Sequence, residues 1–124
     1  MITGFYEQTK DLDDYELKTL LPAMVNSMKG HIGAGAAISS TEAIAKMKKH
    51  GMKITGPRFR KIMHVIRVSG MVPGIVGTST GYFVANNYEE YGKYLTSINE
   101  RLTHIQSLRD AITEQYDNFK RTMQ

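Results

Sequence analysis

The sequence predicts a mainly α-helical fold that carries a small β-hairpin and ends in a long helix. Apolar residues recur at helical spacing in three stretches between residues 17 and 69. Two short β-prone runs follow around a glycine-flanked turn, and a heptad pattern then continues to the end of the chain. With 124 residues, of which 41% are hydrophobic, the chain suits one modest core with an extension.

Residues 1–16 are polar and acidic, and their pattern assigns them only weakly. Asp11, Asp13 and Asp14 lack the Gly and the distant Glu of a calcium loop, so we expect them to start a helix. The first helix is expected over roughly Leu17 to Lys29, with its firm part beginning near Thr19, because Pro22 suits only a first helical turn. Its apolar face is formed by Leu20, Leu21, Met24, Val25 and Met28.

The glycines of residues 30–35 then interrupt the helical pattern. No strand precedes them and no Lys-Ser or Lys-Thr pair follows, so they predict a flexible connector rather than a phosphate-binding loop. A capping box comes next, in which Ser39 accepts from the third amide and Glu42 reaches back to the Ser39 amide. The helix that it starts is expected to end at Gly51.

Thr55 is expected to cap a third helix that ends at Gly70. The apolar stripe of this helix is formed by Phe59, Ile62, Met63 and Ile66. At about 100° per residue, Lys61, His64 and Val68 point away from the stripe, and three arginines lie on its flanks. These are Arg58, Arg60 and Arg67.

The runs MVPGIVG and GYFVA predict a β-hairpin, joined by Thr78, Ser79 and Thr80. Pro73 indicates an edge strand, because proline cannot donate to a β-ladder.

Asn87 is expected to cap a long helix that continues to Gln124 without a proline. Its apolar residues alternate at spacings of three and four over five repeats, which is a heptad pattern. A helix of 37 residues is about 55 Å long and exceeds the width of a small domain, so we expect its distal half to pair in a homodimeric coiled coil. The expected dimerisation residues are Leu102, Ile105, Arg109, Ile112, Tyr116 and Phe119.

The positive charge of the chain is concentrated in one segment. Residues 43–88 contain eight Lys or Arg and no Asp or Glu, whereas residues 1–42 hold three Lys and six acids, and residues 89–124 hold five basic residues and six acids. Such a segment sets up a positive field that attracts polyanions. A solvated basic surface is the alternative, although such surfaces usually mix both signs.

Three helices followed by a hairpin, with a capped turn between the second and third helices, is the order of a winged helix-turn-helix. The sequence therefore predicts a winged helix-turn-helix domain over residues 1–86 that binds double-stranded DNA, followed by the long C-terminal helix over residues 87–124. In this arrangement the third helix reads the DNA and the hairpin is the wing. Arg58 and Lys61 are candidates for base contacts, and Arg60 and Arg67 for phosphate contacts. The full set of expected DNA-binding residues is Lys53, Arg58, Arg60, Lys61, His64, Arg67, Thr78, Ser79 and Thr80.

Residues 17–112 resemble small winged-helix proteins encoded by bacteriophages and prophages, and two stretches carry the resemblance. They are AISSTEAIAKMKKHGMKITGPRFRKIMHVIRVSG and MVPGIVGTSTGYFVANNYEEYGKYLTSINERLTHIQSLRDAI. The resemblance implies a DNA-binding protein of a phage or mobile element, a transcriptional regulator or replication accessory factor in the bacterial cytoplasm. One feature departs from these proteins: the expected wing tip, Thr78, Ser79 and Thr80, carries no Arg or Lys.

Catalytic and metal-binding patterns are absent from the sequence. There is no cysteine, and the four histidines form no i,i+4 pair, so no zinc site is expected. Glu89 and Glu90 suit the first turn of a helix better than an acid–base pair. We expect no enzymatic activity, cofactor or small-molecule substrate. No signal peptide or membrane-spanning segment is expected either, which favours a cytoplasmic protein.

A second interpretation of the sequence is a protein-interaction module. Winged helices also serve as docking domains, and a long coiled helix is a natural partner surface. The uncharged wing and the aliphatic residues Val65 and Val68 favour this alternative, while the acid-free segment favours DNA binding.

Overall fold

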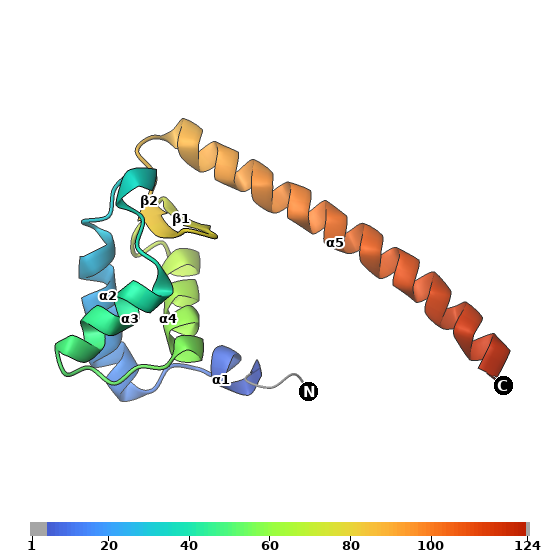
Figure 1. Cartoon of the computed structure of the whole chain (residues 1–124), viewed down its shortest axis with the longest axis horizontal. Helices are drawn as coiled ribbons and strands as arrows, with labels where there is room; N and C mark the ends of the chain where they lie inside the picture. The colour runs from blue at the N-terminus through green and yellow to red at the C-terminus, as the bar shows by residue number, and fades with distance from the viewer. Residues whose placement is uncertain (1–4, 124) are drawn as a thin grey trace. The chain divides into compact units, whose positions relative to one another are not determined.

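The structure, a computed structural model, describes residues 5–123 and confirms a mainly helical fold with a two-stranded hairpin and a long C-terminal helix (Figure 1). The helices are α1 (Phe5–Thr9), α2 (Leu21–Met28), α3 (Ser40–Lys49), α4 (Gly56–Ser69) and α5 (Tyr88–Met123). A π-helical turn at Glu16–Leu20 leads directly into α2, and a short 3-10 helix lies at Ala34–Ala36. The strands are β1 (Ile75–Thr78) and β2 (Gly81–Val84).

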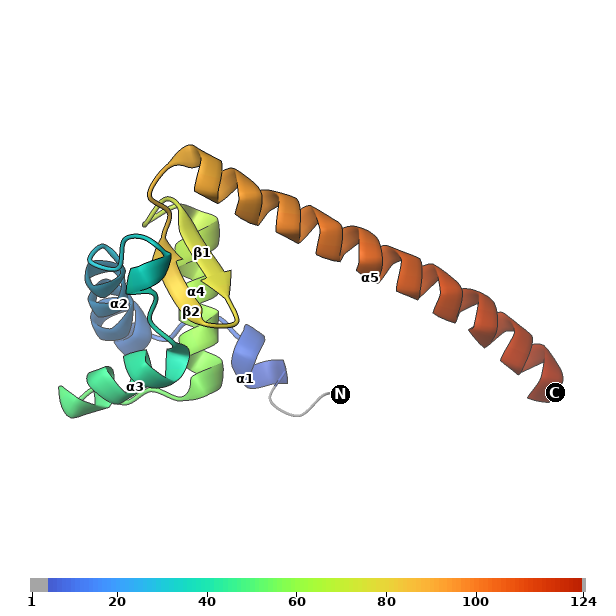
Figure 2. The same ribbon diagram turned by 45° about the horizontal axis from the view of Figure 1, so that its top comes forward.

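The described residues divide into two compact units at the junction between Tyr88 and Glu89. The first unit holds every buried residue of the described chain, and α5 has none. Its core lies between α2, α3, α4 and the hairpin, which Figure 2 shows grouped together, with α1 beside α4.

Helix α4 supplies the centre of that core. The predicted apolar stripe is confirmed, because Phe59, Ile62, Met63 and Ile66 are among its most deeply buried side chains. They pack with the apolar residues expected on the first helix, of which Leu20, Leu21, Met24 and Met28 are buried.

The two predicted N-caps are confirmed. The Ser39 hydroxyl accepts from the Glu42 amide at 3.1 Å, and the Thr55 hydroxyl accepts from the Arg58 amide at 3.4 Å. The second half of the predicted capping box differs, because the Glu42 carboxylate accepts from the Ser39 hydroxyl rather than from its amide.

The first helix begins earlier than the sequence pattern predicted. The Asp13 carboxylate accepts from the Glu16 amide at 2.8 Å, and the Glu16 carboxylate accepts from the Asp13 amide at 2.9 Å. This reciprocal pair starts a helical segment, so the expectation that these acids begin a helix is confirmed. Pro22 falls in the first turn of α2, directly after the π-helical turn.

The prediction of a flexible connector after α2 is wrong, because the segment pairs with β2. The Gly33 amide donates to Val84, and the Val84 amide donates to His31, at 2.8 and 2.7 Å. Ile38 and Tyr82 exchange both of their backbone hydrogen bonds, at 2.9 and 2.8 Å. The other edge of β2 pairs antiparallel with β1, from Ile75 opposite Val84 to Thr78 opposite Gly81. Strand β2 therefore lies between β1 and residues 31–38.

Gly81 makes this three-segment arrangement possible. Its φ is +135°, and a Cβ atom there would lie 2.4 Å from the Ile38 carbonyl oxygen. Only glycine combines that backbone angle with such a close approach.

Gly81→Ala should therefore lower the free energy of unfolding by more than about 2 kcal/mol, through backbone strain and the clash with Ile38. Urea denaturation would measure the change. Gly35→Ala is the matched control, because no atom lies within 4 Å of the position that its new methyl group would take, and its effect should stay within about 0.5 kcal/mol. Equal effects of the two substitutions would contradict the close approach at Gly81.

Candidate nucleic-acid interface

The exposed side of α4 carries most of the cations that the sequence assigned to DNA binding. Arg60 and His64 are exposed, and Lys61 and Arg67 are partly buried. Val68 is 69% exposed, which leaves an apolar side chain on the same side of the helix. The helix therefore has a buried apolar face and a solvent face that is basic with one aliphatic residue.

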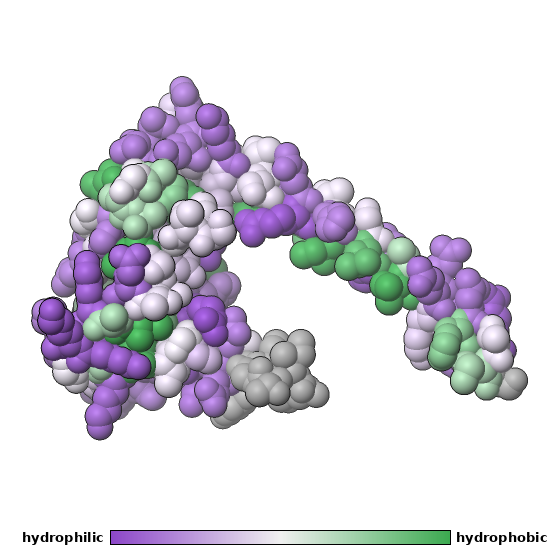
Figure 3. All heavy atoms as spheres, viewed as in Figure 1, coloured by the Kyte–Doolittle hydropathy of each residue, from purple (hydrophilic) through white to green (hydrophobic). Residues whose placement is uncertain are grey.

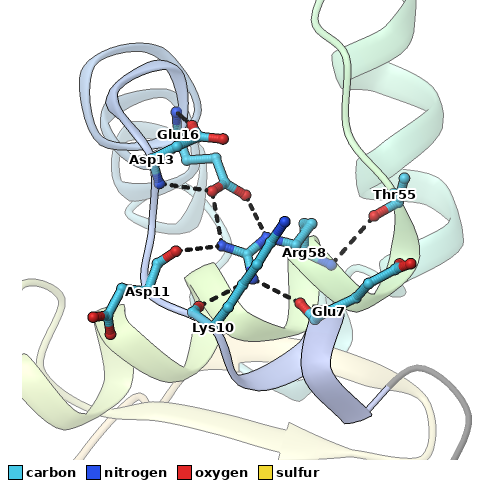
Figure 4. A network of polar contacts seen from close by, with 7 residues as sticks. All are labelled: Glu7, Lys10, Asp11, Asp13, Glu16, Thr55 and Arg58. Carbon is cyan, nitrogen blue, oxygen red and sulfur yellow. Dashed lines mark hydrogen bonds and ion pairs between the residues drawn. The ribbon is translucent and has the colours of Figure 1, made fainter.

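Arg58 is not part of that solvent face, and the structure corrects the expectation that it reaches a base. The residue is only 8% exposed. Figure 4 shows the guanidinium group enclosed by the N-terminal segment and the start of the first helix. Its Nε donates to Glu16 Oε2 at 2.7 Å, and its Nη2 donates to Glu16 Oε1 at 2.8 Å.

Backbone carbonyls complete the coordination of Arg58. Its Nη1 donates to the carbonyl oxygens of Glu7 and Lys10, at 2.6 and 3.0 Å, and its Nη2 donates to that of Asp11 at 3.1 Å. Each of the three guanidinium nitrogens thus has an acceptor within the protein. Arg58 fixes the N-terminal segment to α4 and has no free nitrogen to offer to DNA.

The Glu16–Arg58 pair was missed because its partners lie 42 residues apart. Helical spacing did carry a signal, since Arg58 precedes the buried Ile62 by four residues and Ile66 by eight. The acidic residues before the first helix supply the matching charge. Because Glu16 is itself 4% exposed, the pair is a structural ion pair of the core boundary.

The pair shifts the protonation equilibria of both partners. The hydrogen bonds from Arg58 lower the pKa of Glu16 from its ordinary value of 4.5, although burial acts in the opposite direction. The hydrogen bonds to Glu16 raise the pKa of Arg58 in turn, again against the effect of burial.

The remaining predicted residues lie in two exposed loops. Lys53 is exposed in the link between α3 and α4, where its amide donates to the Tyr15 hydroxyl at 2.9 Å. Thr78, Ser79 and Thr80 are exposed at the hairpin turn. The hydroxyls of Thr78 and Thr80 lie 2.8 Å apart, so these two side chains already hydrogen-bond within the turn.

The predicted dimerisation residues all lie exposed along α5, where Figure 3 shows an apolar stripe among polar residues. Leu102, Ile105, Ile112, Tyr116 and Phe119 are each more than half exposed. Arg109 forms an ion pair with the neighbouring Asp110, at 3.1 Å.

The sequence pattern left out Leu108, which is exposed one residue before Arg109. Arg109 therefore has apolar neighbours in Leu108, directly before it, and in Ile105 and Ile112, the heptad positions before and after it.

Neither a metal centre nor a membrane-spanning helix emerges from residues 5–123. No three His, Asp or Glu side chains in this range are grouped so that they could hold a metal ion. No helix in the range is both long and apolar enough to cross a bilayer. Comparison with protein-family models, curated proteins and solved structures gave no match.

Glu16→Gln should destabilise the protein by about 3 kcal/mol at neutral pH, because it leaves the Arg58 charge buried without its partner. The pKa of Glu16 is lowered on folding, so the stabilisation is complete above 4.5 and is lost as the pH falls through the folded-state value. The difference in unfolding free energy between the two proteins should therefore shrink below pH 4.5.

Urea denaturation from pH 7 to pH 3 measures this dependence. Asp14→Asn is the control, because the Asp14–Lys18 pair is solvent-exposed and spans 3.9 Å, and it should change stability little at any pH. A Glu16→Gln effect that stays constant across this range would contradict an ionised Glu16.

Proposed function

We propose that this chain is a non-enzymatic winged helix-turn-helix protein that binds duplex DNA as a homodimer. The observation that carries the proposal is the exposed basic side of α4, which lies opposite a fully buried apolar stripe and within a segment free of acidic residues. A helix that is fixed on one face and cationic on the other suits insertion into the major groove.

The arrangement of the elements supports this fold. The first helix is followed by residues 31–38 beside β2, then by α3 and α4, and then by the hairpin. The isolated antiparallel bridge between Ile38 and Tyr82 lies between the first and second helices in the chain, where a winged helix-turn-helix carries a short third strand beside its hairpin. In this fold α3 and α4 are the helix-turn-helix pair and the turn at Ser79 and Thr80 is the tip of the wing.

Arg60 is the leading candidate for contact with the nucleic acid. It is exposed in the first turns of α4, the end of a recognition helix that contacts base edges in the major groove. His64 follows one turn later on the same side, and Val68 one turn after that. A basic residue, a histidine and an aliphatic residue at this spacing offer a phosphate or guanine contact, a hydrogen bond and a surface for a thymine methyl group.

Lys53 and Arg67 extend the basic surface around this row as phosphate contacts, and Lys61 stays a candidate for a base contact in the proposal. The wing contributes hydroxyl groups only, because Thr78, Ser79 and Thr80 carry no charge. Contacts of the wing to phosphate oxygens fit these side chains better than insertion into the minor groove.

The dimer in this proposal forms through α5. Its apolar residues keep a heptad register from Tyr91 to Met123, and none of them is buried in the single chain. A second copy of the same helix would remove this stripe from water. Arg109 is the one charged residue of the register, and a polar residue at a core position costs stability while it fixes the alignment of the helices.

The resemblance to phage and prophage proteins extends the proposal to the biological setting. A basic winged helix with a dimerisation helix fits a regulator of transcription or an accessory factor of replication in the bacterial cytoplasm. The second candidate function is protein docking, which the exposed Val68 and the uncharged wing favour.

Arg60→Glu should weaken binding to generic duplex DNA at least tenfold at low salt. The slope of log affinity against log salt should fall by about 0.9 for each phosphate that the variant no longer binds. Gel retardation over a salt series measures both quantities. Lys29→Glu, at the end of α2, makes the same charge change away from α4 and should have a much smaller effect.

Equal losses for the two variants would mean that only net charge matters, and retention of full affinity by Arg60→Glu would overturn the role of Arg60 in DNA binding. Arg58 is unsuitable for this test, because its loss would destabilise the fold.

Ile112→Lys should convert the dimer into a folded monomer, because it places a charge in the apolar stripe of α5. Light scattering at micromolar concentration measures the mass, and circular dichroism checks that the first unit stays folded. Glu114→Lys changes a residue of the same helix outside the heptad core and should leave the dimer intact. A monomeric unmodified chain, or dimers of both variants, would overturn pairing through α5.

A further inference from the structure

A pocket of about 280 Å³ lies between α2, α3 and α4, wholly within the first unit. Its floor is apolar and buried, formed mainly by Met24, Met28, Met47, Met63 and Phe59. In Figure 3 hydrophobic residues are exposed beside α3, with hydrophilic residues around them. This pocket plays no part in the DNA-binding surface proposed above, which lies on the opposite side of α4.

The floor suits a flat or flexible apolar body. Methionine side chains are unbranched and polarisable, so they adapt to different shapes and make favourable contacts with aromatic rings. The pocket volume is close to the lower end of the roughly 300–1,000 Å³ found for small-molecule sites. A small ligand fits this volume.

The rim of the pocket is polar and carries hydrogen-bond donors. It includes Ser27, Lys46 and His50, and none of the lining residues is acidic. The His50 Nδ1 lies 2.9 Å from the Lys46 carbonyl oxygen. Because a carbonyl only accepts, Nδ1 carries the proton, and this bond holds the ring at the edge of the pocket.

Lys46 brings a positive charge to the lining of the pocket. None of the ion pairs formed by residues 5–123 involves it. An ammonium group above an apolar floor pairs favourably with a carboxylate whose hydrocarbon part is buried beneath it.

We propose that this pocket binds a small hydrophobic monocarboxylate, with its apolar body on the methionine floor and its carboxylate at Lys46. The chemistry defines the class, which includes short fatty acids and aromatic acids. The proposal does not depend on DNA binding, because occupancy is measured on the protein alone.

The test uses the intact protein labelled with ¹³C at the methionine methyl groups. Met24, Met28, Met47, Met52 and Met63 line the pocket, whereas Met71 and Met123 lie exposed outside it and report non-specific effects. Octanoate and 2-naphthoate are the probes, and 1-octanol and 2-naphthalenemethanol are their neutral counterparts. Saturable shifts of the lining methyl groups are expected, with carboxylate affinities of roughly 0.1–1 mM.

Lys46→Gln should weaken both carboxylates about tenfold and leave the neutral alcohols unchanged, because it removes the charge and keeps the stem. Lys48→Gln is the matched control, since Lys48 is exposed on the same helix but does not line the pocket. The proposal is overturned if the lining methyl groups show no saturable shift, or if Met71 and Met123 shift equally. Identical carboxylate affinities of the two variants would also overturn it, as they would indicate an apolar site without a carboxylate partner.

Discussion

The fold depends on one buried ion pair, formed by Glu16 and Arg58. Two charges that are nearly removed from water are costly unless their hydrogen bonds are complete. Here the guanidinium group donates to both carboxylate oxygens and to the carbonyls of Glu7, Lys10 and Asp11. The carboxylate also accepts from the Asp13 amide, so it holds the start of the first helix and α4 at the same time. The pair therefore joins the N-terminal segment, the first helix and α4.

This pair also removes Arg58 from the basic residues of α4 that are exposed to solvent. Arg58 is neutralised inside the protein, and the N-terminal segment covers its side of α4. The exposed positions Arg60 and His64 lie on another side of the helix, where the acid-free segment supplies the surrounding charge. The N-terminal segment contributes carbonyl oxygens to Arg58 in addition to the Glu16 carboxylate, so it binds the arginine largely through its backbone. The positive field of the first unit is thus confined to α3, α4 and the links beside them.

Local sequence patterns predicted most of the helices and the hairpin, but they did not predict contacts between residues far apart in the sequence. The caps at Ser39 and Thr55, the stripe on α4 and the heptads of α5 follow from spacings within a few residues. The burial of Arg58 depends on a partner 42 residues away, and the pairing of residues 31–38 with β2 joins segments about 50 residues apart. The glycines suggested a flexible connector, but Gly33 has a conformational role, since it takes a φ of +86° where the chain pairs with β2. The pocket beside α3 was also beyond prediction, because methionines of three helices line it and each looks like ordinary core in its own helix.

The two units of the chain differ in how much of their apolar surface is buried. The first unit holds every buried residue between residues 5 and 123. Helix α5 has the opposite character, because its apolar stripe is exposed along its length and has no core of its own. An isolated helix of this kind gains little from propensity alone, and its apolar face is stabilised by burial against a second surface. In the proposed dimer each unit then has one role: α4 provides a modest set of cations for one DNA site, and α5 joins two such sets. Because linked sites raise the effective concentration of the second binding step, a reading helix with few free cations can still reach useful affinity.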